Sequence, residues 1–192
     1  MKRNSILLTA LKGFGYIILG NVMCLFVTMG LCMFGTNIFL KIVAAICSTA
    51  IFLMLVFTVA WKDGTRERSL VALHRVEGEQ KHRWTLIGLL MFLFAAAPSI
   101  VLLLNKLLFP AADTLYIYRF ISGSAYPYVL LFVEPVVVDE AWTGTTLRQI
   151  DSMSALFPAL MTAYYLLVPV AAKLGYRCGF NDKLNKDKIM YK

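Results

Sequence analysis

Two long stretches without a charged side chain constrain the fold of this chain more than any other sequence feature. Between Lys12 and Lys41 there are 28 consecutive uncharged residues, and between Lys41 and Lys62 there are 20 more. About 20 apolar residues in a helix suffice to cross the hydrocarbon core of a bilayer. Hydrophobic residues make up 59% of the sequence and charged residues 16%, whereas soluble domains are about 45–50% apolar and about 25% charged. A soluble globular enzyme is therefore excluded, and so is a disordered chain.

The sequence predicts an all-α protein, a polytopic transmembrane helical bundle that forms one integral membrane domain over residues 1–192. The four predicted membrane-spanning helices cover about 13–37, 42–61, 84–105 and 152–172. The remaining parts are a loop at 62–83, a segment at 106–151 and a basic tail at 173–192. Gly175 is predicted to cap the last helix, because glycine often follows a helix C-terminus.

The segment 106–151 leaves the number of spans open. It is apolar in patches, but charged residues, prolines and the Ser122–Gly123–Ser124 turn interrupt it. Zero, one or two spans in this segment give four, five or six helices in total. We favour four helices with an external, membrane-skirting segment, because a charge at the bilayer centre costs about 3 kcal/mol. Its tyrosines also suit the headgroup level, where amphipathic rings are enriched.

The distribution of charge predicts which side of the membrane each segment faces. The N-terminal segment, the 62–83 loop and the 173–192 tail hold 15 of the 19 Lys and Arg residues and have a net charge of +9. The two remaining connections, at Lys41 and over 106–151, have a net charge of −1. Cytoplasmic segments carry the excess of Lys and Arg, so an even number of helices with both termini in the cytoplasm is expected. The same clustering explains the basic composition without nucleic acid.

Small residues recur at every fourth position in the first and last predicted helices, and therefore share one helix face. In the first helix they are Gly20, Cys24, Thr28, Cys32 and Thr36. In the last helix they are Ala155, Ala159 and Ala163. Such faces let helices approach closely in lipid. They are predicted to pack against helices of the same chain, or else to dock a membrane-protein partner or a second copy.

Arg119 and Glu134 are the most prominent candidates for a polar functional pair. Ionisable residues near membrane depth are functional hypotheses by default, and these two could pair with each other or line a solute path. The sequence contains no recognisable catalytic, cofactor-binding or metal-binding motif. The four cysteines lack Cys-x-x-Cys spacing and are interpreted as small apolar residues. The chain is therefore expected to need no cofactor, and a catalytic role is not favoured.

The tail at 173–192 is predicted to lie on the membrane surface. It carries six Lys and Arg residues against two Asp residues. Juxtamembrane cations gain about 1 kcal/mol each near an anionic leaflet. The expected partners are thus the lipid bilayer and, at the tail, anionic lipid.

Several short motifs resemble small, uncharacterised polytopic membrane proteins of Gram-positive bacteria. They are the stretch from Trp61 to Arg68, Ala97–Pro98, Val168–Pro169, Leu174–Gly175–Tyr176 and Gly179. The resemblance implies a location in the plasma membrane of a bacterium. It implies no activity and supplies no site residues.

Three functional hypotheses follow from these observations. The first is a non-catalytic integral membrane protein that acts as an accessory or assembly subunit of a larger membrane complex. The second is the substrate-capture component of a small-solute transporter, with its pocket around Arg119, Tyr126 and Glu134. The third, placed last, is a membrane-embedded enzyme that acts on lipid or peptide.

Overall fold

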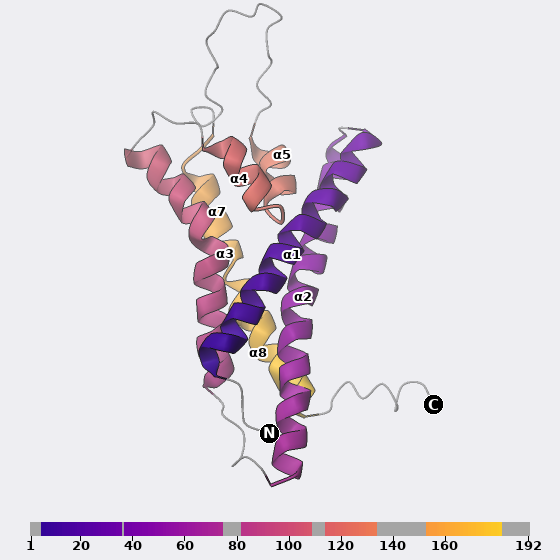
Figure 1. Cartoon of the computed structure of the whole chain (residues 1–192). Helices are drawn as coiled ribbons and strands as arrows, with labels where there is room; N and C mark the ends of the chain where they lie inside the picture. The colour runs from indigo at the N-terminus through magenta and orange to yellow at the C-terminus, as the bar shows by residue number, and fades with distance from the viewer. Residues whose placement is uncertain (1–4, 36, 75–81, 109–113, 134–152, 182–192) are drawn as a thin grey trace, which may run out of the picture. The chain divides into compact units, whose positions relative to one another are not determined.

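Helices make up all the regular secondary structure in the described part of the chain (Figure 1). The computed structural model describes residues 5–35, 37–74, 82–108, 114–133 and 153–181. Its helices are α1 (Ile6–Met33), α2 (Ile38–Ala72), α3 (Arg83–Leu108), α4 (Leu115–Ile121), α5 (Tyr126–Phe132), α7 (Leu156–Tyr164) and α8 (Leu167–Phe180). The predicted all-α class is confirmed.

Four helical stretches in the described residues are long and apolar enough to cross a membrane. They are α1, α2, α3 and the stretch Leu156–Phe180, which consists of α7 and α8. Large apolar side chains are exposed along each of them, for example Leu7, Phe39, Leu107 and Leu160. Monomeric soluble proteins rarely expose apolar surface on this scale. The prediction of a membrane-embedded bundle with four candidate spans is confirmed.

Two helices continue well beyond the C-terminal ends of the predicted spans. α2 continues to Ala72 and α8 to Phe180, so the first part of the 62–83 loop and of the 173–192 tail is helical. The prediction that Gly175 caps the last helix is wrong, because the C-cap is Asn181. The end of an apolar run predicts where a helix leaves the membrane. The helix can continue beyond that point, because its backbone hydrogen bonds do not require apolar side chains.

The chain divides into two units, and α1, α2 and α3 each contribute one portion to each unit. The first unit comprises 1–18, 53–94 and 166–192, and the second comprises 19–52 and 95–165.

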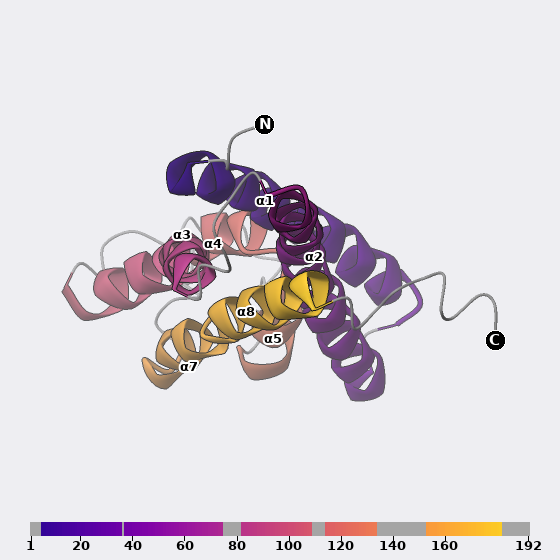
Figure 2. The same cartoon turned by 90° about the horizontal axis from the view of Figure 1, so that it is seen from below.

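Glycines bring α8 close to α2 in the first unit. A Cβ atom at Gly64 would overlap the carbonyl oxygen of Tyr176, and one at Gly175 would overlap that of Phe57. A Cβ atom at Gly179 would overlap the carbonyl oxygen of Trp61. Figure 2 shows α8 against this part of α2. Gly175 thus serves close helix packing, which in lipid depends on small residues.

The described part of the 106–151 segment packs inside the second unit. It forms α4 and α5, two helices of 7 residues each that are too short to span a bilayer. Leu115 and Tyr118 from α4 and Val129 from α5 join one apolar core with Leu102 of α3 and Phe157 of α7. Tyr118, expected at the headgroup level, is buried in this core instead.

Candidate functional site: a polar hairpin and an arginine pocket

The second unit contains a helical hairpin whose tip is buried. Ser122, Gly123 and Ser124 connect α4 to α5, and all three are buried. A Cβ atom at Gly123 would overlap the carbonyl oxygen of Asn21 in α1. Glycine is therefore required for the tip to approach the α1 backbone this closely.

Hydrogen bonds fix this tip to α1 and to the end of α7. The backbone N–H of Ser124 donates to Oδ1 of Asn21 at 3.0 Å, and the Ser124 hydroxyl donates to the same oxygen at 2.8 Å. The Ser124 hydroxyl also lies 3.2 Å from the hydroxyl of Tyr165. In a low-dielectric interior, satisfied polar contacts of this kind rigidify the structure.

Two further hydroxyl contacts hold the helices of the hairpin. The Tyr118 hydroxyl in α4 lies 3.0 Å from Oγ of Ser99 in α3. The Tyr128 hydroxyl in α5 lies 2.7 Å from Oγ1 of Thr49 in α2, to which Tyr164 donates at 3.4 Å. The hairpin is thus held by neutral hydroxyl and amide groups, which fixes the orientation of the α4 side chains.

A cavity of about 90 Å³ lies between α1 and the hairpin. It is lined by Leu25 and Met29 from α1, Arg119 and Phe120 from α4, and Tyr126 from α5. The structure thus brings together Arg119 and Tyr126, two of the residues predicted to form a pocket. Glu134, the predicted partner of Arg119, lies outside the described residues, so that pairing stays a prediction.

Arg119 carries a charge that no described carboxylate neutralises. Its Nε atom is buried and has no hydrogen-bond partner. The described residues of the second unit include Lys41, Lys106 and Arg119 but no Asp or Glu. A buried polar atom without a partner costs about 1–3 kcal/mol, and more for a charged group. The cavity beside Arg119 therefore favours a group with negative charge.

Two residues of the predicted small-residue face of the first helix, Cys24 and Thr28, contact Ser48 of α2. Gly20, Cys24 and Thr28 are buried, and Cys32 is half-buried. The Cys24 thiol donates to the carbonyl oxygen of Ser48 at 3.2 Å, and the Thr28 hydroxyl lies 3.3 Å from Oγ of Ser48. This part of the face packs within the chain. Thr36 lies outside the described residues.

The alanines predicted on the last helix have a different environment. Ala155 is half-buried, whereas Ala159 and Ala163 are exposed on α7. These two exposed alanines do not contribute to the core of the second unit.

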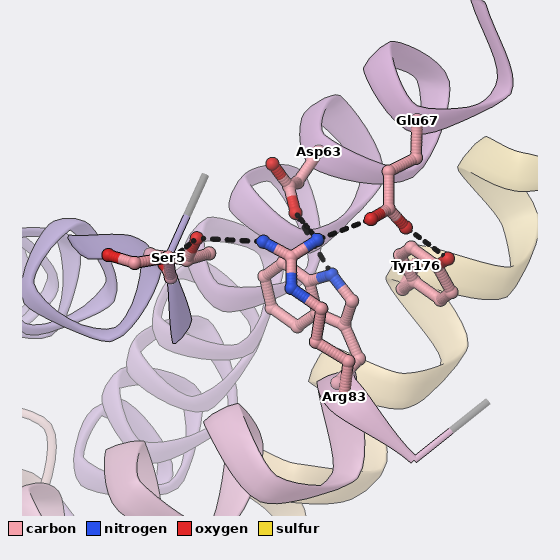
Figure 3. Close-up of polar contacts among 7 residues, drawn as sticks. Ser5, Asp63, Glu67, Arg83 and Tyr176 are labelled. Atoms are coloured by element: carbon pink, nitrogen blue, oxygen red, sulfur yellow. Dashed lines mark hydrogen bonds and ion pairs between the residues drawn. The ribbon is translucent and has the colours of Figure 1, made fainter. Parts of the chain in front are cut away.

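Sequence reasoning missed an ionic cluster in the first unit, drawn in Figure 3. Arg83 donates from Nη1 to Oε1 of Glu67, and its Nη1 lies 3.6 Å from Oδ2 of Asp63. Its Nη2 donates to the Thr9 hydroxyl at 3.2 Å. Arg83 is 5% exposed and Glu67 2%. Because Asp63 and Glu67 are four residues apart on α2, both carboxylates face the same guanidinium.

Aromatic residues complete this cluster. The Tyr176 hydroxyl of α8 donates to Oε2 of Glu67, and the Trp84 indole donates to Oδ2 of Asp63 at 3.1 Å. The rings of Trp84 and Tyr176 stack with centroids 5.8 Å apart. The cluster joins α1, α2, α3 and α8, and its composition is that of a structural ion pair rather than of a ligand site. The sequence does show Asp63 and Glu67 at helical spacing, but this spacing does not identify Arg83 as their partner.

Within the described ranges, no group of three or more His, Cys, Asp or Glu side chains is arranged to hold a metal ion. The four cysteines are unpaired thiols. Comparison of the chain with known protein families, curated proteins and solved structures gives no match. The function must therefore be argued from the site itself.

Proposed function

We propose that this chain is a non-catalytic, membrane-embedded protein that binds a small anionic group at Arg119 and acts as the capture component of a larger membrane complex. This proposal develops the second hypothesis drawn from the sequence. The observation that carries it is the Arg119 guanidinium, which borders a cavity in a unit whose described residues include no Asp or Glu.

The chemistry of arginine supports an oxyanion as the bound group. A guanidinium offers donors in a planar fork that matches carboxylate and phosphate, and charge-assisted hydrogen bonds of this kind are about twice as strong as neutral ones. Tyr126 adds a second polar side chain to the cavity lining. An oxyanion in the cavity would neutralise the charge of Arg119.

The size of the cavity limits what can enter it. Pockets for drug-sized ligands occupy about 300–1,000 Å³, whereas this cavity measures about 90 Å³. A vitamin-sized solute does not fit as a whole. A single phosphate, sulfate or carboxylate group suits the available space.

Thermal unfolding of the purified full-length protein in a neutral detergent tests this function. Inorganic phosphate and sulfate are the probes, with sodium chloride at matched ionic strength as the reference. A ligand that binds only the folded state stabilises it by about 2.7 kcal/mol at 100 times its Kd. We expect phosphate to raise the melting temperature of the parent protein but not of Arg119→Gln.

Arg177→Gln is the matched control, because it removes one positive charge from an exposed position on α8. It should keep the response to phosphate. The proposal is wrong if the two variants respond alike, or if phosphate acts no more strongly than chloride at equal ionic strength.

We also propose that the protein resides in the plasma membrane of a bacterium with both termini in the cytoplasm, and that its basic tail contacts anionic lipid. The charge difference of +9 against −1 between the two sets of segments supports this orientation. Single cysteines introduced into a cysteine-free background can be labelled in intact cells. A cysteine near Lys186 should be protected from an impermeant reagent, and labelling from outside would overturn the orientation.

A further inference from the structure

The surroundings of the Arg119 cavity bear on where its ligand comes from. Two of the lining side chains, Met29 and Phe120, are 44% and 51% exposed. Their helices expose further large apolar side chains nearby in sequence, among them Phe26 on α1 and Ile117 and Ile121 on α4. In a protein whose helices are suited to a bilayer, such surface faces lipid rather than water.

The cavity admits only part of an amphiphilic molecule. Its volume of about 90 Å³ is well below the roughly 300–1,000 Å³ of pockets that enclose a drug-sized ligand, and it suits one oxyanion group. Any larger ligand must leave the rest of its atoms outside the cavity, beside the exposed Met29 and Phe120. Contact with such an apolar surface is favourable for apolar atoms of the ligand and unfavourable for polar ones.

We infer that the occupant is the anionic phosphate headgroup of a membrane lipid, with its acyl chains lying along the apolar surface of α1 and α4. The inference rests on the proposed function, since it names the molecule that carries the oxyanion bound at Arg119. A free phosphate ion has the same headgroup chemistry. To reach this site it must shed its hydration and pass the apolar surface, whereas a lipid phosphate already lies at the edge of the hydrocarbon.

Binding of defined lipids to the full-length protein tests the inference. Protein in a neutral detergent is titrated with phosphatidylglycerol or phosphatidylcholine, and bound lipid is counted by native mass spectrometry. Glycerol 3-phosphate and inorganic phosphate are the probes without acyl chains. We expect phosphatidylglycerol to bind at least about tenfold more tightly than the other three, because only it combines net negative charge with acyl chains.

Two variants separate the roles of headgroup and chain. Arg119→Gln should weaken phosphatidylglycerol binding by about 10- to 100-fold, the usual effect of losing a hydrogen-bonded charge. Lys62→Gln should not, because it removes one positive charge from an exposed position on α2, outside the basic tail that is proposed to contact anionic lipid. Phe120→Ala changes an exposed side chain and leaves Arg119 in place. It should weaken phosphatidylglycerol binding and leave the response to inorganic phosphate unchanged.

The contrary outcomes are distinguishable. If inorganic phosphate or glycerol 3-phosphate binds as tightly as phosphatidylglycerol and depends on Arg119, the lipid source is wrong and the proposed function stands. If no probe binds the parent protein, both are wrong. Equal losses in Arg119→Gln and Lys62→Gln would assign lipid binding to general basic charge and overturn the inference. Should Arg119→Gln not fold, the parent protein and Phe120→Ala decide between chain-dependent and chain-independent binding.

Discussion

Two arginine sites, one in each unit, show how differently the same side chain is used. In the first unit, Arg83 is buried, contacts Glu67 and Asp63 and donates to Thr9. In the second unit, Arg119 is half-buried and borders a cavity, and the described residues of that unit include no Asp or Glu. The Nε atom of each arginine is buried without a hydrogen-bond partner, so the two sites differ in their carboxylates. Arg83 is neutralised within the fold, whereas Arg119 is the proposed site for a ligand.

The polar groups near the two arginines also differ: they are charged in the first unit and neutral in the hairpin of the second unit. The cluster in the first unit contains two carboxylates that face one guanidinium, and Tyr176 and Trp84 donate to those carboxylates. The hairpin in the second unit is held by hydroxyl and amide groups that do not contact Arg119 among the described interactions, such as Ser124 with Asn21. The described hydrogen bonds that hold the hairpin thus involve neutral groups.

The largest expected effect concerns the Arg83 cluster. Glu67→Ala should lower the free energy of unfolding by about 3–5 kcal/mol, because it leaves a buried guanidinium without its principal partner. Denaturant or thermal unfolding in a neutral detergent measures this change. Ser69→Ala, at an exposed position on the same helix, should change the stability by less than about 0.5 kcal/mol.

A double variant sharpens this test. Replacing both charges, as in Glu67→Leu with Arg83→Met, should cost clearly less than the sum of the two single substitutions, since neither charge is then left buried alone. Strict additivity would contradict the interpretation of Arg83 and Glu67 as one structural unit.

A smaller effect is expected at the tip of the hairpin. Gly123→Ala should destabilise the protein by about 1–3 kcal/mol, because the new Cβ atom would overlap the Asn21 carbonyl oxygen. Gly30→Ala in α1 is the control, since a Cβ atom there meets nothing within 4 Å. That change should be neutral or stabilise the helix by up to about 1 kcal/mol. Equal melting temperatures for the two variants would contradict the close approach of hairpin and α1.

The smallest effect on stability is expected at Arg119. In neutral detergent without phosphate or anionic lipid, Arg119→Leu should change the free energy of unfolding by less than about 0.5 kcal/mol or increase it, because it removes a charge that no described carboxylate neutralises. Adding phosphatidylglycerol should then stabilise the parent protein more than the variant. If Arg119→Leu lowers the free energy of unfolding as much as Glu67→Ala does, Arg119 is a structural residue like Arg83 and the proposed difference between the two sites is wrong.

The architecture was predictable from the sequence because it depends on local patterns. Uncharged stretches longer than a bilayer crossing require helices, and they identified all four candidate spans that the described residues contain. The ends of those helices were less predictable. α2 continues 11 residues beyond the predicted end at Trp61, up to Ala72, because a solvated helix can be as regular as an apolar one.

The sequence by itself also determined that Arg119 is a costly residue in an apolar segment, and Tyr126 was predicted to share a pocket with it. Only the tertiary structure decided which arginine has partners. Arg83 was one of six cations in a basic loop, and Arg119 was the one predicted to pair with an acid. Arg83 is neutralised because the fold places the first residue of α3 beside α2, within reach of Asp63 and Glu67, which precede it by 16 or more residues. Charge and periodicity are local properties of a chain, whereas the partner of a charge depends on contacts between distant segments.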